Sequence, residues 1–150
     1  MDRGIRAGEN FMAGYNCAQS VSMAFSDLVG MDEKAVARLA SPFGGGMGRM
    51  REVCGAVSGM YLILGILYGY DSVDTDDHKS RLYSQVQELA AAFREKTGTI
   101  LCREILENPP SDPNPSPRTQ SYYAQRGACV YAVMTAARLL QQFIQDHPEG

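Results

Sequence analysis

The sequence predicts an all-α fold, an irregular helical bundle of about four long and two short helices. In several segments, apolar residues recur at three- and four-residue steps, the period of a helix that buries one face. No stretch alternates as a strand would, and no repeat of fixed period is evident. A chain of 150 residues has the size of one ordinary domain, so a single domain over residues 1–150 is expected.

The first helical segment lies within residues 11–28 and is apolar on two sides. The two stripes consist of Phe11, Tyr15, Ala18 and Phe25, and of Gly14, Cys17, Val21, Ala24 and Leu28. Gly30 supplies a stop after this segment. Asp32 can cap a short second helix over residues 35–39, which Pro42 then closes.

A glycine-rich loop comes next, with Gly44, Gly45, Gly46 and Gly48 close together. Such a backbone can turn sharply and approach a ligand closely, so these glycines are predicted to help bind a cofactor. A third helix is expected over about residues 51–68. It is apolar on nearly every side, which is typical of a helix at the centre of a bundle.

The acidic run 71–77 is predicted to be a solvated connection. The helix after it ends at Gly98, and its apolar stripe consists of Leu82, Val86, Leu89 and Phe93. A short helical piece at residues 99–107 carries Cys102.

Residues 108–117 are expected to form an extended loop, because they contain five of the seven prolines. The final helix is predicted over about residues 119–145. Its apolar stripe consists of Cys129, Val133, Ala136, Leu140 and Phe143. Cys129 is therefore expected to face the interior.

Charge and composition exclude several classes of protein. The 14 Lys and Arg against 17 Asp and Glu give a net charge of −3, so no nucleic-acid partner is expected. The segment 1–6 is not followed by the apolar region of a signal peptide, which favours a cytoplasmic location. The uncharged stretch 54–70 is shorter than the roughly 20 residues that span a bilayer, so no membrane association is expected.

The four cysteines are the candidate functional residues. Each lies on a different predicted helix, and they are Cys17, Cys54, Cys102 and Cys129. None belongs to a Cys-x-x-Cys pair, which argues against the usual zinc-ribbon and bacterial ferredoxin patterns. In a reducing compartment they are expected to be free thiols, metal ligands or a redox pair. The alternative is that they are small apolar side chains that fill the core.

Cys54 is predicted to be the most reactive of the four. It follows the glycine loop, lies in the expected first turn of a helix and is close in sequence to Arg49 and Arg51. These features favour the thiolate and so a lowered pKa, although Glu52 partly opposes them.

Three segments carry a family resemblance. They are Gly-Tyr-Asn-Cys-Ala-Gln-Ser-Val at 14–21, Phe-Gly-Gly-Gly-Met-Gly at 43–48 and Cys-Gly-Ala-Val-Ser-Gly at 54–59. Together with the two single downstream cysteines, they resemble the C-GCAxxG-C-C family of proposed redox-active proteins, over about residues 10–140. Val53 departs from the pattern, because the family name has glycine before the second cysteine.

The resemblance implies that Cys17, Cys54, Cys102 and Cys129 form one functional set. The family is similar to a cysteine-rich module fused to redox proteins, including a domain of split-Soret cytochromes for which an iron–sulfur cluster has been proposed. An iron–sulfur cluster or another metal, held by the four cysteines, is therefore the expected cofactor.

Three functional hypotheses follow. In the first, the four cysteines bind an iron–sulfur cluster for electron transfer or sensing. In the second, the chain is a thiol–disulfide redox protein with Cys54 as the attacking thiol. In the third, it is a non-catalytic helical interaction module with core cysteines. Any enzymatic activity would be that of an oxidoreductase, with an unknown redox partner protein. The third and final helices could support a homodimer.

Overall fold

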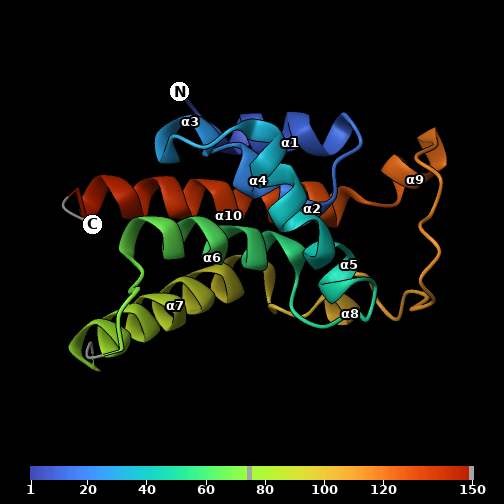
Figure 1. Ribbon diagram of the computed structural model, residues 1–150. Coiled ribbons are helices and arrows are strands. Elements are labelled where there is room, and N and C mark those ends of the chain that lie inside the picture. The colour runs from blue at the N-terminus through green and yellow to red at the C-terminus, as the bar shows by residue number, and fades with distance from the viewer. Residues whose placement is uncertain (74–75, 149–150) are drawn as a thin grey trace.

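The computed structural model describes residues 1–73 and 76–148, and the regular elements in these ranges are helices (Figure 1). The α-helices are α1 (Arg3–Met12), α2 (Cys17–Met23), α3 (Ser26–Val29), α4 (Glu33–Ala40), α5 (Gly44–Met47), α6 (Gly55–Tyr68), α7 (Asp76–Thr97), α8 (Cys102–Ile105), α9 (Gln120–Ala124) and α10 (Gly127–Asp146). A 3-10 turn, η1 (Ser41–Phe43), precedes α5. The only β-type pairing in the described ranges is the bridge between Val53 and Leu101. The all-α prediction is confirmed.

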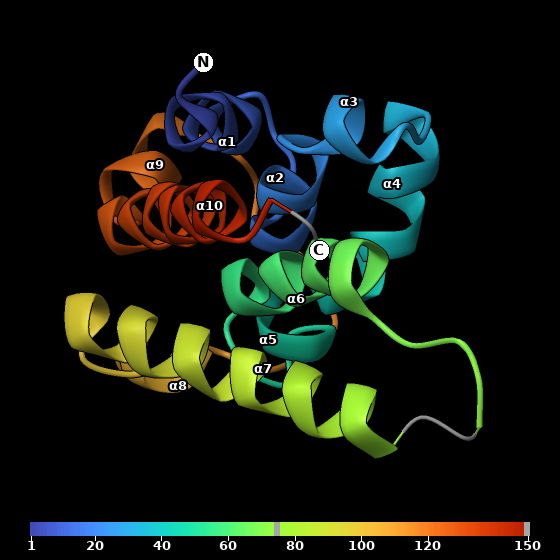
Figure 2. The same ribbon diagram turned by 90° about the vertical axis from the view of Figure 1, so that its left-hand side faces the viewer.

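The helices stack around α10, which runs through the middle of the molecule (Figure 1). Helix α1 packs on one side of α10, and α6 and α7 pack on the other. Turning the molecule shows α2 beside α10, above α6, with α7 as the outermost layer (Figure 2). Helix α2 thus contacts α1, α6 and α10, which places its first residue among three longer helices.

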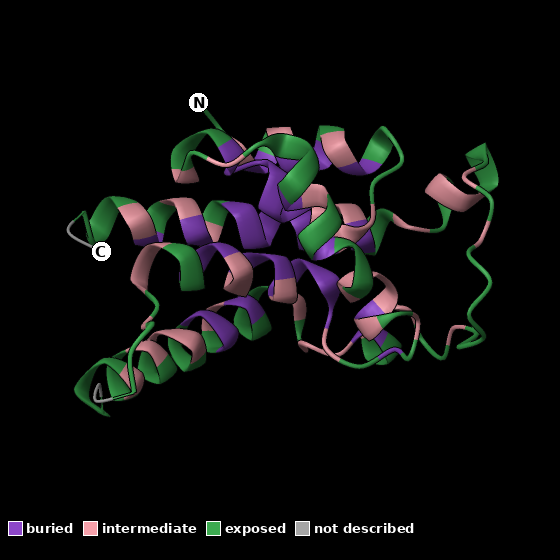
Figure 3. Cartoon of the chain, viewed as in Figure 1, coloured by how far each residue is buried: buried purple, intermediate pink, exposed green. Residues whose placement is uncertain are grey.

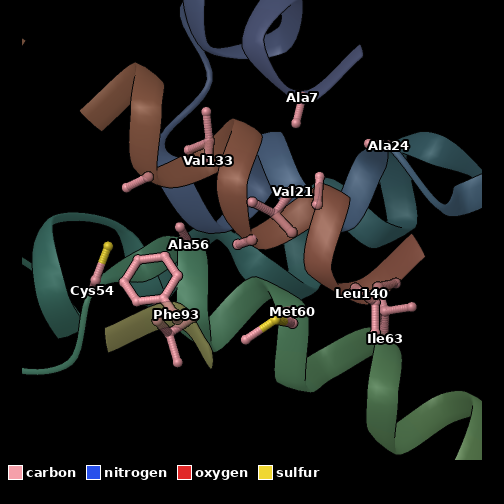
Figure 4. Packing of buried hydrophobic residues seen from close by; sticks show 14 of the residues in the cluster. Ala7, Val21, Ala24, Cys54, Ala56, Met60, Ile63, Phe93, Val133 and Leu140 are labelled. Carbon is pink, nitrogen blue, oxygen red and sulfur yellow. The ribbon is translucent and has the colours of Figure 1, made fainter. Parts of the chain in front are cut away.

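The buried residues gather where α2, α6 and α10 meet (Figure 3). Met60 and Ile63 of α6 and Val133 and Leu140 of α10 are fully buried, and Phe93 of α7 closes the layer (Figure 4). Each such side chain contributes about 1.5–3 kcal/mol when removed from water. The prediction that the third helix is central is confirmed, since its buried residues lie in this cluster.

Two predicted helix ends are also confirmed by local contacts. The Asp32 carboxylate accepts a hydrogen bond from the Ala35 N–H at 3.2 Å and caps α4. Helix α7 ends before Gly98, whose φ of 89° is unfavourable for other residues. The predicted acidic connection 71–77 includes residues 74 and 75, which lie outside the described residues.

The predicted first helix is wrong, because the chain breaks between α1 and α2. Gly14 has a φ of 115°, which ends the helical path. The Asn16 side chain then accepts a hydrogen bond from the Gln19 N–H at 2.9 Å, and the Gln19 side chain accepts one from the Asn16 N–H at 3.1 Å. This reciprocal pair is a capping box. Cys17 therefore begins a helix instead of lying inside one.

The start of the third helix and the continuity of the last helix also differ from the prediction. Helix α6 begins at Gly55, because Arg49 and Arg51 have φ values of 68° and 61° and cannot be helical. The last predicted helix is divided at Arg126, so Cys129 lies in the first turn of α10. No described helix is both long and apolar enough to cross a membrane.

Candidate functional site

A cavity of about 310 Å³ lies at the end of the bundle where α2, α6 and α10 begin. Its walls include all four cysteines, Cys17, Cys54, Cys102 and Cys129. Cys54, Cys102 and Cys129 are buried, and Cys17 is partly exposed. The structure therefore brings together side chains that are far apart in the sequence.

Every cysteine lies at the beginning of a helix. Cys17 is the first residue of α2, Cys54 precedes the first residue of α6, Cys102 is the first of α8, and Cys129 is the third of α10. Figure 4 shows Cys54 at one edge of the packed core, beyond Ala56. The N-terminal ends of the longer helices α6 and α10 carry partial positive charge, which favours an anion beside Cys54 and Cys129.

The glycine loop fits tightly against this site. Gly44, Gly45, Gly46 and Gly48 all line the cavity. A Cβ atom on Gly46 would lie 2.6 Å from the Cys102 Cβ and 2.9 Å from the Arg51 Cα, so only glycine fits there. The φ values of Gly45, Gly46 and Gly48 are 66°, 68° and 61°. The loop therefore brings the backbone against Cys102, and whether it also binds a cofactor stays a prediction.

Two main-chain hydrogen bonds hold Cys54 beside Cys102. The Cys54 N–H donates to the Ile100 carbonyl at 2.7 Å, and the Cys102 N–H donates to the Glu52 carbonyl at 2.7 Å. They flank the bridge between Val53 and Leu101. This short ladder fixes the two cysteines on one wall of the cavity.

Arg51 is the buried charge of the site, with 6% of its surface exposed. Its Nη1 donates to the Cys102 sulfur at 3.6 Å, and its Nε donates to the Pro110 carbonyl at 2.9 Å. Its Nη2 is buried without a hydrogen-bond partner among the described residues. A buried guanidinium nitrogen without an acceptor is costly to the fold, and Nη2 has essentially no accessible surface toward the cavity or toward solvent.

Three further arginines line the cavity, Arg49, Arg118 and Arg126. The guanidinium groups of Arg118 and Arg126 each lie 4.7 Å from the centre of the Tyr122 ring. Arg118 also donates to the Phe11 carbonyl at 3.1 Å and to the Tyr15 carbonyl at 3.0 Å. Sequence reasoning did not find Arg118 and Arg126, because nothing near them in the sequence relates them to the cysteines.

The structure reverses the expected order of thiol acidity. Burial raises the pKa of Cys54 to about 12, so the prediction of a lowered pKa for Cys54 is wrong. The arginines near Cys54 in sequence point elsewhere: Arg51 donates to Cys102, and Arg49 donates to the Asp112 carbonyl at 2.8 Å. Burial also raises the pKa of Cys102, although the hydrogen bond from Arg51 opposes it.

Cys129 is the thiol that the site makes acidic. The pKa of Cys129 is lowered, first by a hydrogen bond from Cys17 and then by the charges of nearby arginines, of which Arg126 is the strongest. The same hydrogen bond and burial raise the pKa of Cys17. The pair therefore combines a less acidic thiol, Cys17, with a more acidic one, Cys129.

Neither a disulfide nor a site for a single metal ion is formed in the described ranges. All four cysteines are free. No three His, Cys, Asp or Glu side chains among the described residues are placed to hold one metal ion. The four cysteines are thus lining residues of one cavity and not the ligands of a formed metal site in the described part of the chain.

The order of these cysteines and glycines identifies the family. Residues 15–143 match the family described as "Putative redox-active protein (C_GCAxxG_C_C)". The chain belongs to the C_GCAxxG_C_C family. This confirms the resemblance found in the sequence. No curated protein and no solved structure matches the chain.

Proposed function

We propose that this C_GCAxxG_C_C protein is a two-electron thiol–disulfide redox protein in which Cys129 attacks and Cys17 resolves. The observation that supports this most directly is that Cys17 and Cys129 line the same cavity as a coupled pair, in which Cys17 and nearby arginines lower the pKa of Cys129. A more acidic thiol beside a less acidic one is the arrangement that thiol–disulfide exchange uses.

The reaction balances with a substrate disulfide as the oxidant. The Cys129 thiolate attacks one substrate sulfur, which breaks the substrate S–S bond and releases one thiolate. That thiolate takes the proton of Cys17. The Cys17 thiolate then attacks the Cys129 sulfur, closes the Cys17–Cys129 disulfide and releases the second substrate thiolate, which is protonated by water. Two electrons pass from the cysteines to the substrate.

An iron–sulfur cluster is the second candidate, supported by a separate observation. Four cysteines line one cavity, and Arg51, which donates to the Cys102 sulfur, lies in the same wall. Cys17, Cys54, Cys102 and Cys129 would hold the cluster, which would supply one-electron transfer.

One experiment separates these candidates. Protein purified without oxygen is treated with a disulfide, and its free thiols, iron and acid-labile sulfide are counted. We expect a colourless protein that loses two thiols and forms a Cys17–Cys129 crosslink in peptide mapping. The matched control Cys54→Ala should still form this crosslink, and Cys129→Ala should not.

Two results would contradict the proposal. Visible absorption with equal amounts of iron and acid-labile sulfide selects the cluster. A colourless protein whose four thiols stay free in the presence of the disulfide selects the helical module with core cysteines. We also propose a cytoplasmic location, where thiols are kept reduced. A partner protein would then reduce the Cys17–Cys129 disulfide again.

A further inference from the structure

The charge in the cysteine cavity is opposite to the charge of the whole chain. The protein has a net charge of −3. Yet the charged residues in the cavity wall are four arginines, with no Asp, Glu or Lys among the described lining residues. Arg49 reaches the exposed Asp112 carboxylate at 3.8 Å, outside the cavity lining. Positive charge is therefore concentrated where the thiols lie.

Three of these guanidinium groups have a charge that no described carboxylate balances. Arg51, Arg118 and Arg126 form no ion pair with a carboxylate in the described part of the chain. Stacking on Tyr122 orients Arg118 and Arg126 by their faces. Arg118 keeps only part of its N–H edge for a ligand, because it donates to the Phe11 and Tyr15 carbonyls, whereas the Arg126 side chain stays free of such bonds within the described residues. The Nη2 of Arg51 is buried and unpaired. An anionic ligand would balance this charge.

The backbone at Arg51 is strained, as it is at Met47 and Arg49 of the same loop. Arg51 has a left-handed φ of 61°, which a residue with a side chain adopts at a cost of about 1–3 kcal/mol. The strained conformation points the guanidinium toward Cys102 and the cavity. Such strain persists where the surrounding structure enforces it, commonly at ligand sites.

We propose that the cavity binds a small disulfide bearing carboxylates, with Arg51, Arg118 and Arg126 holding the carboxylates while Cys129 attacks the disulfide sulfur. This substrate class rests on the thiol–disulfide function proposed above. Carboxylates pair with guanidinium groups through two parallel hydrogen bonds. A cavity of about 310 Å³ suits a ligand of this size. The two carboxylate-bearing thiols leave as the reduced products, and Cys17 and Cys129 keep the disulfide.

The test compares symmetric disulfides that differ in charge. Dithiodipropionate carries two carboxylates, cystamine carries two ammonium groups, and hydroxyethyl disulfide is neutral. The rate of Cys17–Cys129 disulfide formation is measured with each and divided by the rate of a free model thiolate with the same reagent. We expect dithiodipropionate to exceed cystamine by at least about tenfold, because guanidinium–carboxylate hydrogen bonds form only with the anion.

Substitutions of single arginines test which side chains cause the preference for dithiodipropionate. Arg126→Gln, at a partly exposed position, and Arg51→Met should each reduce the preference for dithiodipropionate. Arg81→Gln removes the same charge from the exposed face of α7 and should leave it unchanged. Suberate, which has the same length but no disulfide, should bind to the reduced protein in calorimetry and lose affinity in Arg126→Gln.

The outcomes separate this inference from the function on which it rests. Equal normalised rates for the three disulfides, with no suberate binding, overturn the anionic substrate and leave thiol–disulfide exchange standing. If none of the disulfides oxidises the Cys17–Cys129 pair, the exchange reaction and its substrate both fall. If Arg81→Gln reduces the preference for dithiodipropionate as much as Arg126→Gln does, the preference comes from the overall charge of the protein. That result also overturns the inference.

Discussion

Alkylation of the reduced, metal-free protein at neutral pH should modify Cys129 first. Cys54 and Cys129 are almost equally buried, with 5% and 7% of their surfaces exposed, so access does not separate them. Their acidity does. Burial raises the pKa of Cys54 to about 12, whereas the Cys17 hydrogen bond and Arg126 lower the pKa of Cys129 below that of an ordinary thiol.

The expected ratio of rates follows from these pKa values. An ordinary thiol has a pKa of about 8.5, so the two pKa values differ by at least about three, and the thiolate fractions at neutral pH by about a thousandfold. The Cys54 thiolate is more basic and is therefore the better nucleophile. With a Brønsted slope of about 0.45, this reduces the advantage of Cys129 by a factor of roughly 20. Cys129 should therefore react at least about 40-fold faster than Cys54.

The assay is timed alkylation with iodoacetamide, quenched and quantified by peptide mass spectrometry across a pH series. The rate at Cys129 should rise with pH and level off above its lowered pKa, whereas the rate at Cys54 should still be rising at the alkaline end. Arg126→Gln should move the Cys129 midpoint to higher pH, and Arg81→Gln should not. Faster modification of Cys54 than of Cys129 at neutral pH would refute the assignment of the thiolate.

Two further predictions concern the glycine loop and the thiol pair. Gly46→Ala and Gly48→Ala should each cost about 1–3 kcal/mol of stability, because both glycines have a left-handed φ. Only the Gly46→Ala side chain also meets the Cys102 Cβ, so in urea unfolding the Gly46→Ala variant should be less stable than Gly48→Ala by a further ~1–3 kcal/mol. Equal losses in the two variants would mean that the backbone does not press against Cys102. Cys17→Ala removes the proton donor to Cys129, so the midpoint of Cys129 alkylation should move to higher pH; an unchanged midpoint would show that the arginines alone set its acidity.

The fold class could be predicted from the sequence because its signals are local. Helical periodicity, the cap at Asp32 and the stop at Gly98 each depend on a few neighbouring residues. The break before Cys17 also has a local signal, Gly14 followed by the Asn16–Gln19 capping box, but the apolar stripe of Phe11, Tyr15 and Ala18 runs across it and favoured one long helix. The break at Arg126 contains no proline that would have marked it. Periodicity records which side of a segment is buried, and two short helices can bury the same side as one long helix.

The candidate site was only partly predictable for the same reason. The family resemblance grouped the four cysteines, but the acidity of each thiol depends on residues that the fold brings from elsewhere. Arg51 is close to Cys54 in sequence, yet its left-handed backbone turns the guanidinium toward Cys102. Arg126 affects Cys129 because a helix begins between them. Proximity in sequence therefore identified Arg51 as a charge of the site but assigned it to Cys54 instead of Cys102.

The cavity is built from two parts of the fold, and this explains why the four cysteines are not equivalent. Cys54 and Cys102 are fixed by main-chain hydrogen bonds on either side of the bridge between Val53 and Leu101. Cys17 and Cys129 are held by the packing of α2 against α10, and no comparable ladder joins them in the described ranges. Closing a disulfide requires the two sulfurs to approach to about 2 Å, so either pair would have to move from the arrangement of free thiols described here. The pair that contains the more acidic thiol is Cys17 and Cys129, and this acidity, with the arginines that cause it, is the physical ground on which exchange is proposed for that pair.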